Sequence, residues 1–175
     1  MSRQQPEPWL RGTLADHPPA QRAVLHALQL AGEDIARWCA PLSTAQIHAR
    51  PFQLPSVAFH MLHITGSLDR LLTYAEGHPL SETQRRALDA EHARTGTSDA
   101  LLAEFSRGLE TAAARILAIP MADWERPSSV GRDRLPATVA GVLIHCADHT
   151  QRHVGQAVTT AKVVQALAAG ALDIT

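Results

Sequence analysis

The sequence predicts an all-α protein built as a bundle of four long helices. Apolar residues recur at spacings of three and four along four long segments, while no segment shows the alternation of a half-buried strand or the β-branched run of a parallel one. The chain has 175 residues, of which 45% are hydrophobic, and this is enough for one domain with its own core. We therefore predict a single domain over 1–175.

The first two helices are predicted over 18–39 and 56–76. Pro41 ends the first helix, because proline interrupts helical hydrogen bonding, and a loop rich in proline and polar residues then runs to Pro55. Ser56 is expected to cap the second helix, since its hydroxyl can accept from a free backbone N–H of the first turn. The apolar face of the first helix includes Val24, Leu28 and Ile35, and that of the second includes Met61, Leu68 and Leu72.

The third and fourth helices are predicted over 98–119 and 138–168. Ser98 is expected to cap the third helix, and Gly170 follows the end of the fourth. Between these helices, the segment 123–136 holds prolines, a glycine and several charges, so we expect a surface loop there. The four helices are of similar length and amphipathic, which favours packing as a four-helix bundle.

The link between the second and third helices predicts the order in which the helices run. It spans about twenty residues, 77–97, and includes a short helical piece over 82–92. A link of this length can cross the bundle instead of joining neighbours by a tight turn. We therefore predict up-down-down-up connectivity with a long crossover between the second and third helices.

Charge and hydropathy argue against two classes of function. The 16 basic and 17 acidic residues give a formal net charge of −1, and no basic run is present, which argues against nucleic-acid binding through phosphate neutralisation. The apolar stretches are far shorter than the roughly 18–20 residues that a membrane span needs. No secretory signal is visible, and Cys39 and Cys146 form no CxxC pair, so we expect a cytoplasmic protein with reduced thiols.

Histidine is the residue type that the composition leaves unexplained, with ten in the chain. Five of them fall in predicted loops, caps or polar faces, and we expect these to be ordinary solvated residues: His17, His26, His48, His78 and His92. The other five form two groups, with His60 and His63 on the second helix and His145, His149 and His153 on the fourth.

The pair His149 and His153 predicts a metal site inside the bundle. Residues four apart lie on one helix face, and this face is the one expected to look into the core. Imidazoles in an aliphatic core are costly unless they are satisfied, and a metal ion satisfies both at once. His60 or His63 could add a third nitrogen. Three protein ligands leave open positions for water and substrate, as in a catalytic centre.

Other ligand sets stay open at this point. The motif is not that of a zinc protease, because Thr150 stands where that motif needs a glutamate base. A site of two histidines and one carboxylate would use Asp148 or Asp69. Cys146 could supply a thiolate, although a small buried hydrophobe is the commoner role of such a cysteine.

Two segments resemble the DinB-like superfamily of bacterial metal-binding bundles. They are 56–72, which contains FHMLHIT, and 145–156, which ends in HTQRHVGQ. The second is similar to the final-helix motif of that family, and the resemblance extends from about Pro18 to Leu167. It implies a four-helix bundle with one divalent ion, nickel, zinc, iron or manganese. By the same resemblance the ligands are His63, His149 and His153.

The resemblance also suggests what surrounds the ion. His60 and His145 are placed beside the site, with His60 as the substitute ligand if the second helix is rotated. Arg70 and Arg152, each near one of these ligands in the sequence, and Gln156 are candidates for the surroundings of the ion or for contact with a substrate.

The activities of characterised relatives suggest the function. They include S-transferases and isomerases that use bacillithiol or mycothiol, and the iron-binding part of enzymes that make sulfur-containing histidine betaines. The resemblance thus implies a metal-dependent enzyme that activates a low-molecular-weight thiol toward an electrophilic substrate. The alternatives are a metal-dependent hydrolase and a non-catalytic stress-response protein with a structural metal. A homodimer is also expected, since small bundles of this type often pair.

Overall fold

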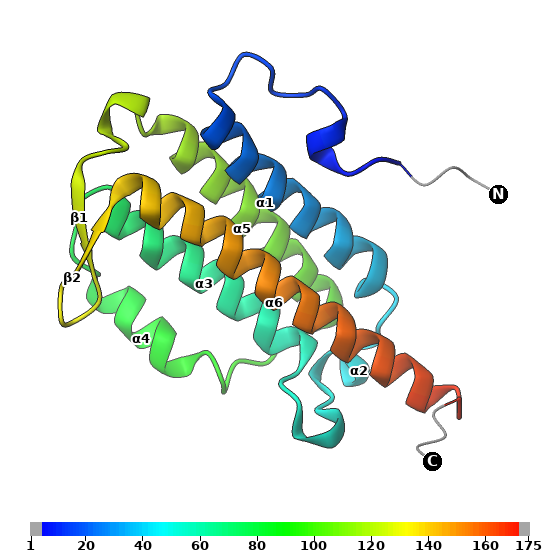
Figure 1. Ribbon diagram of the computed structural model, residues 1–175. Coiled ribbons are helices and arrows are strands. Elements are labelled where there is room, and N and C mark those ends of the chain that lie inside the picture. The colour runs from blue at the N-terminus through cyan, green and yellow to red at the C-terminus, as the bar shows by residue number, and fades with distance from the viewer. Residues whose placement is uncertain (1–4, 172–175) are drawn as a thin grey trace.

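Four long helices packed side by side form most of the structure, a computed structural model that describes residues 5–171 (Figure 1). The helices and strands are α1 (Pro19–Trp38), α2 (Thr44–His48), α3 (Val57–Ala75), α4 (Glu82–Ala90), α5 (Ser98–Ala118), β1 (Pro127–Val130), β2 (Leu135–Thr138) and α6 (Val139–Ala168). The prediction of a mostly helical protein is confirmed. The long helices lie within one residue of the predicted ranges, because each range was set by a sustained apolar face.

Each long helix packs against two others. Helix α1 contacts α5 and α6, and α3 contacts the same two helices. Gln151 donates to the carbonyl of Ala27, and Gln165 donates to the carbonyl of Trp38, so α1 and α6 run in the same direction. Figure 1 shows α3 and α5 running in the opposite direction. Helices α3 and α6 are therefore antiparallel neighbours, and this places the start of one beside the end of the other.

Side-chain caps set where these helices begin. Ser56 accepts a hydrogen bond from the N–H of Phe59 at 3.1 Å, as the sequence predicted, and Thr138 caps α6 in the same way. The predicted cap of α5 was wrong by one residue. Thr97, whose backbone is extended, accepts from the N–H of Ala100, and Ser98 is the first helical residue.

Two short elements lie in segments that the sequence predicted as loops. Helix α2 lies in the link between α1 and α3. Its N-terminus is capped by reciprocal hydrogen bonds between Ser43 and Gln46. The segment 123–136 was predicted to be a surface loop, but strands β1 and β2 form an antiparallel hairpin in which Val130 faces Leu135. These strands have four residues each and contain prolines, so they lack the pattern by which a strand is recognised.

The core is aliphatic and reaches the full length of the bundle. Its largest fully buried side chains include Ile35, Met61, Leu68, Leu72, Ile116 and Leu143. Cys39 and Cys146 are also fully buried and form no disulfide. Burial raises the pKa of each thiol to about 12. Among residues 5–171, no helix is both long enough and apolar enough to cross a bilayer.

Candidate metal centre

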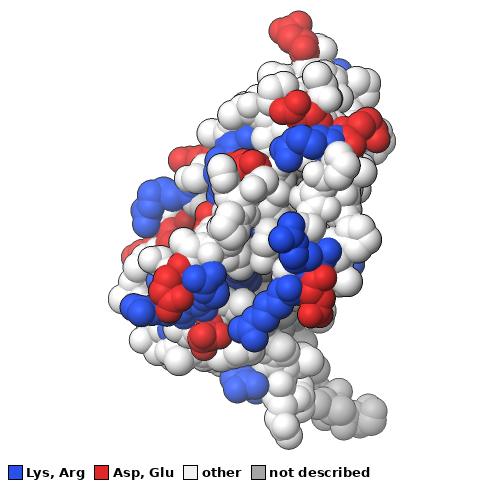
Figure 2. Space-filling model, turned by 90° about the vertical axis from the view of Figure 1, so that its left-hand side faces the viewer, with Lys and Arg blue, Asp and Glu red and all other residues white. Residues whose placement is uncertain are grey.

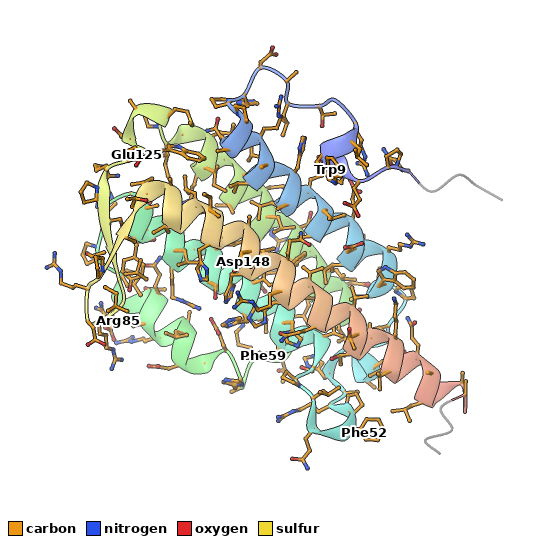
Figure 3. The ribbon with its side chains drawn as sticks, viewed as in Figure 1. Trp9, Phe52, Phe59, Arg85, Glu125 and Asp148 are labelled. Carbon is orange, nitrogen blue, oxygen red and sulfur yellow. The ribbon has the colours of Figure 1, made fainter. Side chains whose placement is uncertain are left out.

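Helices α3 and α6 bring three histidines together from distant parts of the sequence. His63 on α3 lies opposite His149 and His153 on α6, and one ligand atom from each falls within 4.8 Å of the other two. All three side chains are half-buried. In Figure 3, a cluster of nitrogen-bearing side chains lies between the labels of Phe59 and Asp148, where α3 and α6 face one another. The donor set is the one that the resemblance implied.

The spacing of the nitrogens suits a shared metal ion. His63 Nε2 and His149 Nε2 are 3.3 Å apart. Two imidazole nitrogens bound to one ion at about 2.0–2.1 Å, with tetrahedral or octahedral angles, lie roughly 2.8–3.4 Å apart. The other ring nitrogen of His63 is already engaged, because Nδ1 is 2.8 Å from Glu91 Oε2. Nε2 is therefore the atom that His63 offers to a ligand.

The electrostatic surroundings favour neutral imidazoles, which are the form that binds metals. Burial, with smaller contributions from His153 and His63, lowers the pKa of His149 to about 4. Burial and the neighbouring His63 and Arg152 also lower the pKa of His153. At neutral pH these two rings are therefore free of the proton that would compete with an ion.

Glu91 supports the cluster from the crossover and was not predicted from the sequence. It follows α4, is only 7% exposed, and accepts from His63 through Oε2 and from Arg70 Nη1 through Oε1, the latter at 2.6 Å. Burial by itself would raise the pKa of Glu91, but the hydrogen bonds from His63 and Arg70 outweigh it, so the pKa is lower than usual. A carboxylate that orients a ligand histidine in this way is a common feature of metal sites.

Gly66 makes the space for this buried ion pair. A Cβ at this position of α3 would lie 2.7 Å from Glu91 Oε1 and 2.9 Å from Arg70 Nη1. Any larger residue would therefore displace the carboxylate or the guanidinium. The guanidinium is also fixed by Ser67, whose hydroxyl accepts from Nη2 at 3.1 Å. Arg70, a candidate for substrate contact, is thus committed to Glu91 and Ser67.

His60 lies beside the triad and contacts His153, whereas Glu91 contacts His63. Its Nδ1 is 3.1 Å from Nδ1 of His153, and the ring is 2% exposed. Burial, with the neighbouring His153 and His63, lowers the pKa of His60 to about 4. Neutral His60 can accept the Nδ1–H of His153, which leaves Nε2 of His153 for an ion.

The remaining candidates lie farther from the triad. Arg152 and Gln156 are exposed and line, together with His60, a cavity of about 340 Å³ beside the cluster. Arg152 donates to Asp148 at 2.6 Å, and the exposed His145 lies 3.7 Å from the same carboxylate. Of the alternative ligands, Asp148, Asp69 and Cys146 are all outside the metal-binding group found among the described residues.

Two histidines that were predicted to be solvated have structural partners. His26 is 5% exposed, and its Nε2 lies 3.0 Å from the hydroxyl of Thr13. His48 Nε2 lies 2.8 Å from the carbonyl oxygen of Gly96 and so ties α2 to the segment before α5. These contacts join parts of the chain that are far apart in sequence, so local pattern gave no sign of them.

The fold and the histidine cluster define a helical protein with a candidate metal centre. The chain belongs to the DinB superfamily, because the model of that family matches residues 27–157. The resemblance seen in the sequence is thereby confirmed.

A solved structure supports the same fold. It is the crystal structure of a conserved protein from Enterococcus faecalis, which is 18% identical, with a TM-score of 0.68 over 85% of this chain and 98% of that one. No curated protein matches the sequence.

Proposed function

We propose that this protein is a metal-dependent enzyme that activates a low-molecular-weight thiol and transfers it to an electrophile. One divalent ion, nickel, zinc, iron or manganese, would be held by His63, His149 and His153. The scaffold would be a four-helix bundle of the up-down-down-up type. The observation that carries the proposal is the convergence of three imidazoles from two antiparallel helices.

Three features of the donor set fit a catalytic ion. The imidazoles of His149 and His153 are neutral at pH 7, Glu91 orients His63, and the three-histidine set leaves positions for exchangeable ligands. A bound ion would lower the pKa of a thiol or water and so provide a nucleophile near neutral pH.

The chain itself would bind and orient the thiol. The cavity beside the cluster offers Gln156 and the N–H groups of Arg152 that do not bind Asp148, and these can hold a carboxylate or hydroxyl of the thiol compound. In the transfer, the sulfur lone pair forms a bond to an electrophilic carbon, the leaving group departs with its electron pair, and the thiol proton passes to solvent. His60 and Glu91 would keep His153 and His63 fixed while this happens.

The two other functions have less support. A hydrolase needs a free general base, but Glu91, the carboxylate that reaches the triad, is engaged with His63 and Arg70. A structural metal would favour a fourth protein ligand, and Cys146 is not in the group that the described residues form.

Metal analysis and a thiol-transfer assay together test the proposal. Purified protein should contain about one divalent ion per chain, and His149→Ala should lose it. Protein loaded with each metal is then mixed with bacillithiol, mycothiol or glutathione and a chromogenic electrophile. We expect metal-dependent turnover with one of the thiols. The matched control is His78→Ala, which removes an exposed histidine outside the cluster and should leave metal content and rate unchanged.

Each failure has a separate meaning. Equal metal content in the wild type and His149→Ala would contradict the metal centre. Metal binding without any rate above that of His149→Ala, for all three thiols, would contradict the transferase function and leave the metal centre standing. The homodimer stays a prediction.

A further inference from the structure

A second, larger cavity lies between α4 and the β-hairpin. Its volume is about 890 Å³, and its walls come from the end of α3, the loop that follows it, α4 and the hairpin. Cavities of roughly 300–1,000 Å³ are typical of sites for small molecules. Tyr74, which lines it, is eleven residues along α3 from His63, a distance of about 16 Å at the helical rise of 1.5 Å per residue. The cavity is therefore separate from the histidine cluster.

Arginine dominates the charge of this cavity. Arg85, Arg126, Arg132 and Arg134 line it, whereas Asp89 is the one acidic residue of the lining. Arg85 is paired with Glu82 at 3.2 Å. In the part of the chain that the structure describes, the other three arginines form no ion pair with a carboxylate. This concentration of positive charge occurs in a protein whose formal net charge is −1.

One of these arginines is fixed at the wall by a hydrogen bond, and two others are exposed residues of the hairpin loop. Arg126 Nη2 donates to the carbonyl oxygen of Ala75 at 2.7 Å, which fixes its guanidinium at the end of α3. Arg132 and Arg134 belong to the hairpin loop, in which Gly131 and Arg134 both have positive φ. Figure 2 views the molecule from the side that carries the hairpin and α4, and several basic side chains lie in the lower half of that face, interleaved with acidic ones.

The rest of the lining is suited to an apolar group. Tyr74, Leu80 and Leu88 contribute aromatic and aliphatic surface. The arginines that could bind an anion lie on the side of the cavity formed by the hairpin. Guanidinium groups form paired, charge-assisted hydrogen bonds with phosphate oxygens. We propose that this cavity binds a small organic phosphate, with the phosphate against Arg126, Arg132 and Arg134 and the organic part against Tyr74, Leu80 and Leu88.

A small ligand fits these observations better than a nucleic acid does. The arginines converge on one cavity, whereas a polymer backbone needs basic groups spread along a groove. The cavity volume of about 890 Å³ is also in the range typical of sites for small molecules. An oligonucleotide is therefore included below as a competing ligand.

Calorimetric titration tests the inference. Metal-free protein is used, because phosphates also bind metal ions and such binding would be measured together with binding to the arginines. The probes are 4-nitrophenyl phosphate, inorganic pyrophosphate and the uncharged 4-nitrobenzyl alcohol. We expect 4-nitrophenyl phosphate to bind and the alcohol to bind at least about tenfold more weakly. The double variant Arg132→Gln, Arg134→Gln should lower the affinity for 4-nitrophenyl phosphate about tenfold or more. Arg126→Gln provides a second variant outside the hairpin loop.

The matched control removes two exposed arginines elsewhere, Arg50→Gln with Arg107→Gln, and should change affinity less than about twofold. The His63→Ala variant should bind as the wild type does. Equal affinity in the hairpin variant, Arg126→Gln and the wild type would overturn the inference, as would loss of binding in His63→Ala alone. Tighter binding of a single-stranded oligonucleotide than of 4-nitrophenyl phosphate would overturn the choice of ligand.

Discussion

The carboxylate of Glu91 controls how His63 faces the other two histidines. Glu91→Gln keeps the shape of the side chain but removes the charge that Arg70 and His63 share. We expect the affinity for a divalent ion to fall about 10–100-fold, the usual effect of losing a carboxylate that orients a ligand histidine. Competition with a chromogenic chelator measures this. Glu125→Gln, at an exposed position labelled in Figure 3, is the control, and equal affinity in both variants would contradict the role of Glu91.

The three histidines of the triad could be proposed from the sequence, whereas the carboxylate that orients His63 could not. His149 and His153 share a helix face by spacing alone, and His63 followed from the resemblance of its segment to the DinB family. Glu91 lies 28 residues after His63, in a crossover with few apolar residues, and no spacing rule connects the two positions. The three-dimensional course of the crossover was needed to bring them together.

Both thiols should be unreactive in the folded protein. Cys39 and Cys146 have no exposed surface, and burial holds the pKa of each at about 12, so the thiolate that reacts with aromatic disulfides is scarce. We expect the native protein to release none of the coloured thiol from such a reagent. In denaturant, the two cysteines should release two equivalents of the coloured thiol per chain. Rapid reaction of the native protein would show that one cysteine becomes exposed without unfolding.

At the scale of helices, the close approach of α3 and α5 depends on Gly108. A Cβ at Gly108 would lie 2.5 Å from Cγ2 of Thr65 on α3, and the Cα of Thr65 is 3.9 Å away. We expect Gly108→Ala to lower the free energy of unfolding by about 1–3 kcal/mol, because the added methyl group pushes the helices apart. Chemical denaturation measures the change.

Gly155→Ala is the matched control for this prediction. Gly155 lies on α6, and a Cβ there would meet nothing within 4 Å. Alanine should therefore stabilise the helix by up to about 1 kcal/mol, since it restricts the unfolded chain and favours helix. Stabilisation of similar size in both variants would show that α3 and α5 can separate without cost.

Element length explains which parts of the fold could be predicted. The long helices carry about five to eight turns of periodic apolar residues, which outweigh local exceptions. Helix α2 has five residues and each hairpin strand has four, too few to establish a period. The hairpin is instead fixed by tertiary contacts, such as the hydrogen bond from Ser128 to the carbonyl of Tyr74 at the end of α3.

At the scale of the whole molecule, the buried imidazoles make stability depend on pH. His60 and His149 have folded-state pKa values of about 4, against 6.5 ordinarily. Between these values the unfolded chain binds more protons, so the stabilising contribution is complete above about pH 6.5 and is lost as pH falls through about 4. We expect the metal-free protein to lose stability from about pH 7 to about pH 4.5.

Urea denaturation at these two pH values checks the expectation. The double variant His60→Asn, His149→Asn cannot take up these protons, so its loss of stability should be smaller than that of the wild type. His78→Asn, at an exposed site, should behave as the wild type does. A loss as large in the double variant as in the wild type would assign the pH dependence to other groups.

The order in which the ligands occur along the chain bears on when an ion can be acquired. His63 and His149 are 86 residues apart, and two of the three ligands lie on the last helix of the fold. A chain still on the ribosome can form α1, α3 and α5 while it has only His63 of the triad. One imidazole is a weak ligand, so an ion held by the proposed triad would be bound stably only after α6 has been synthesised and packed against α3.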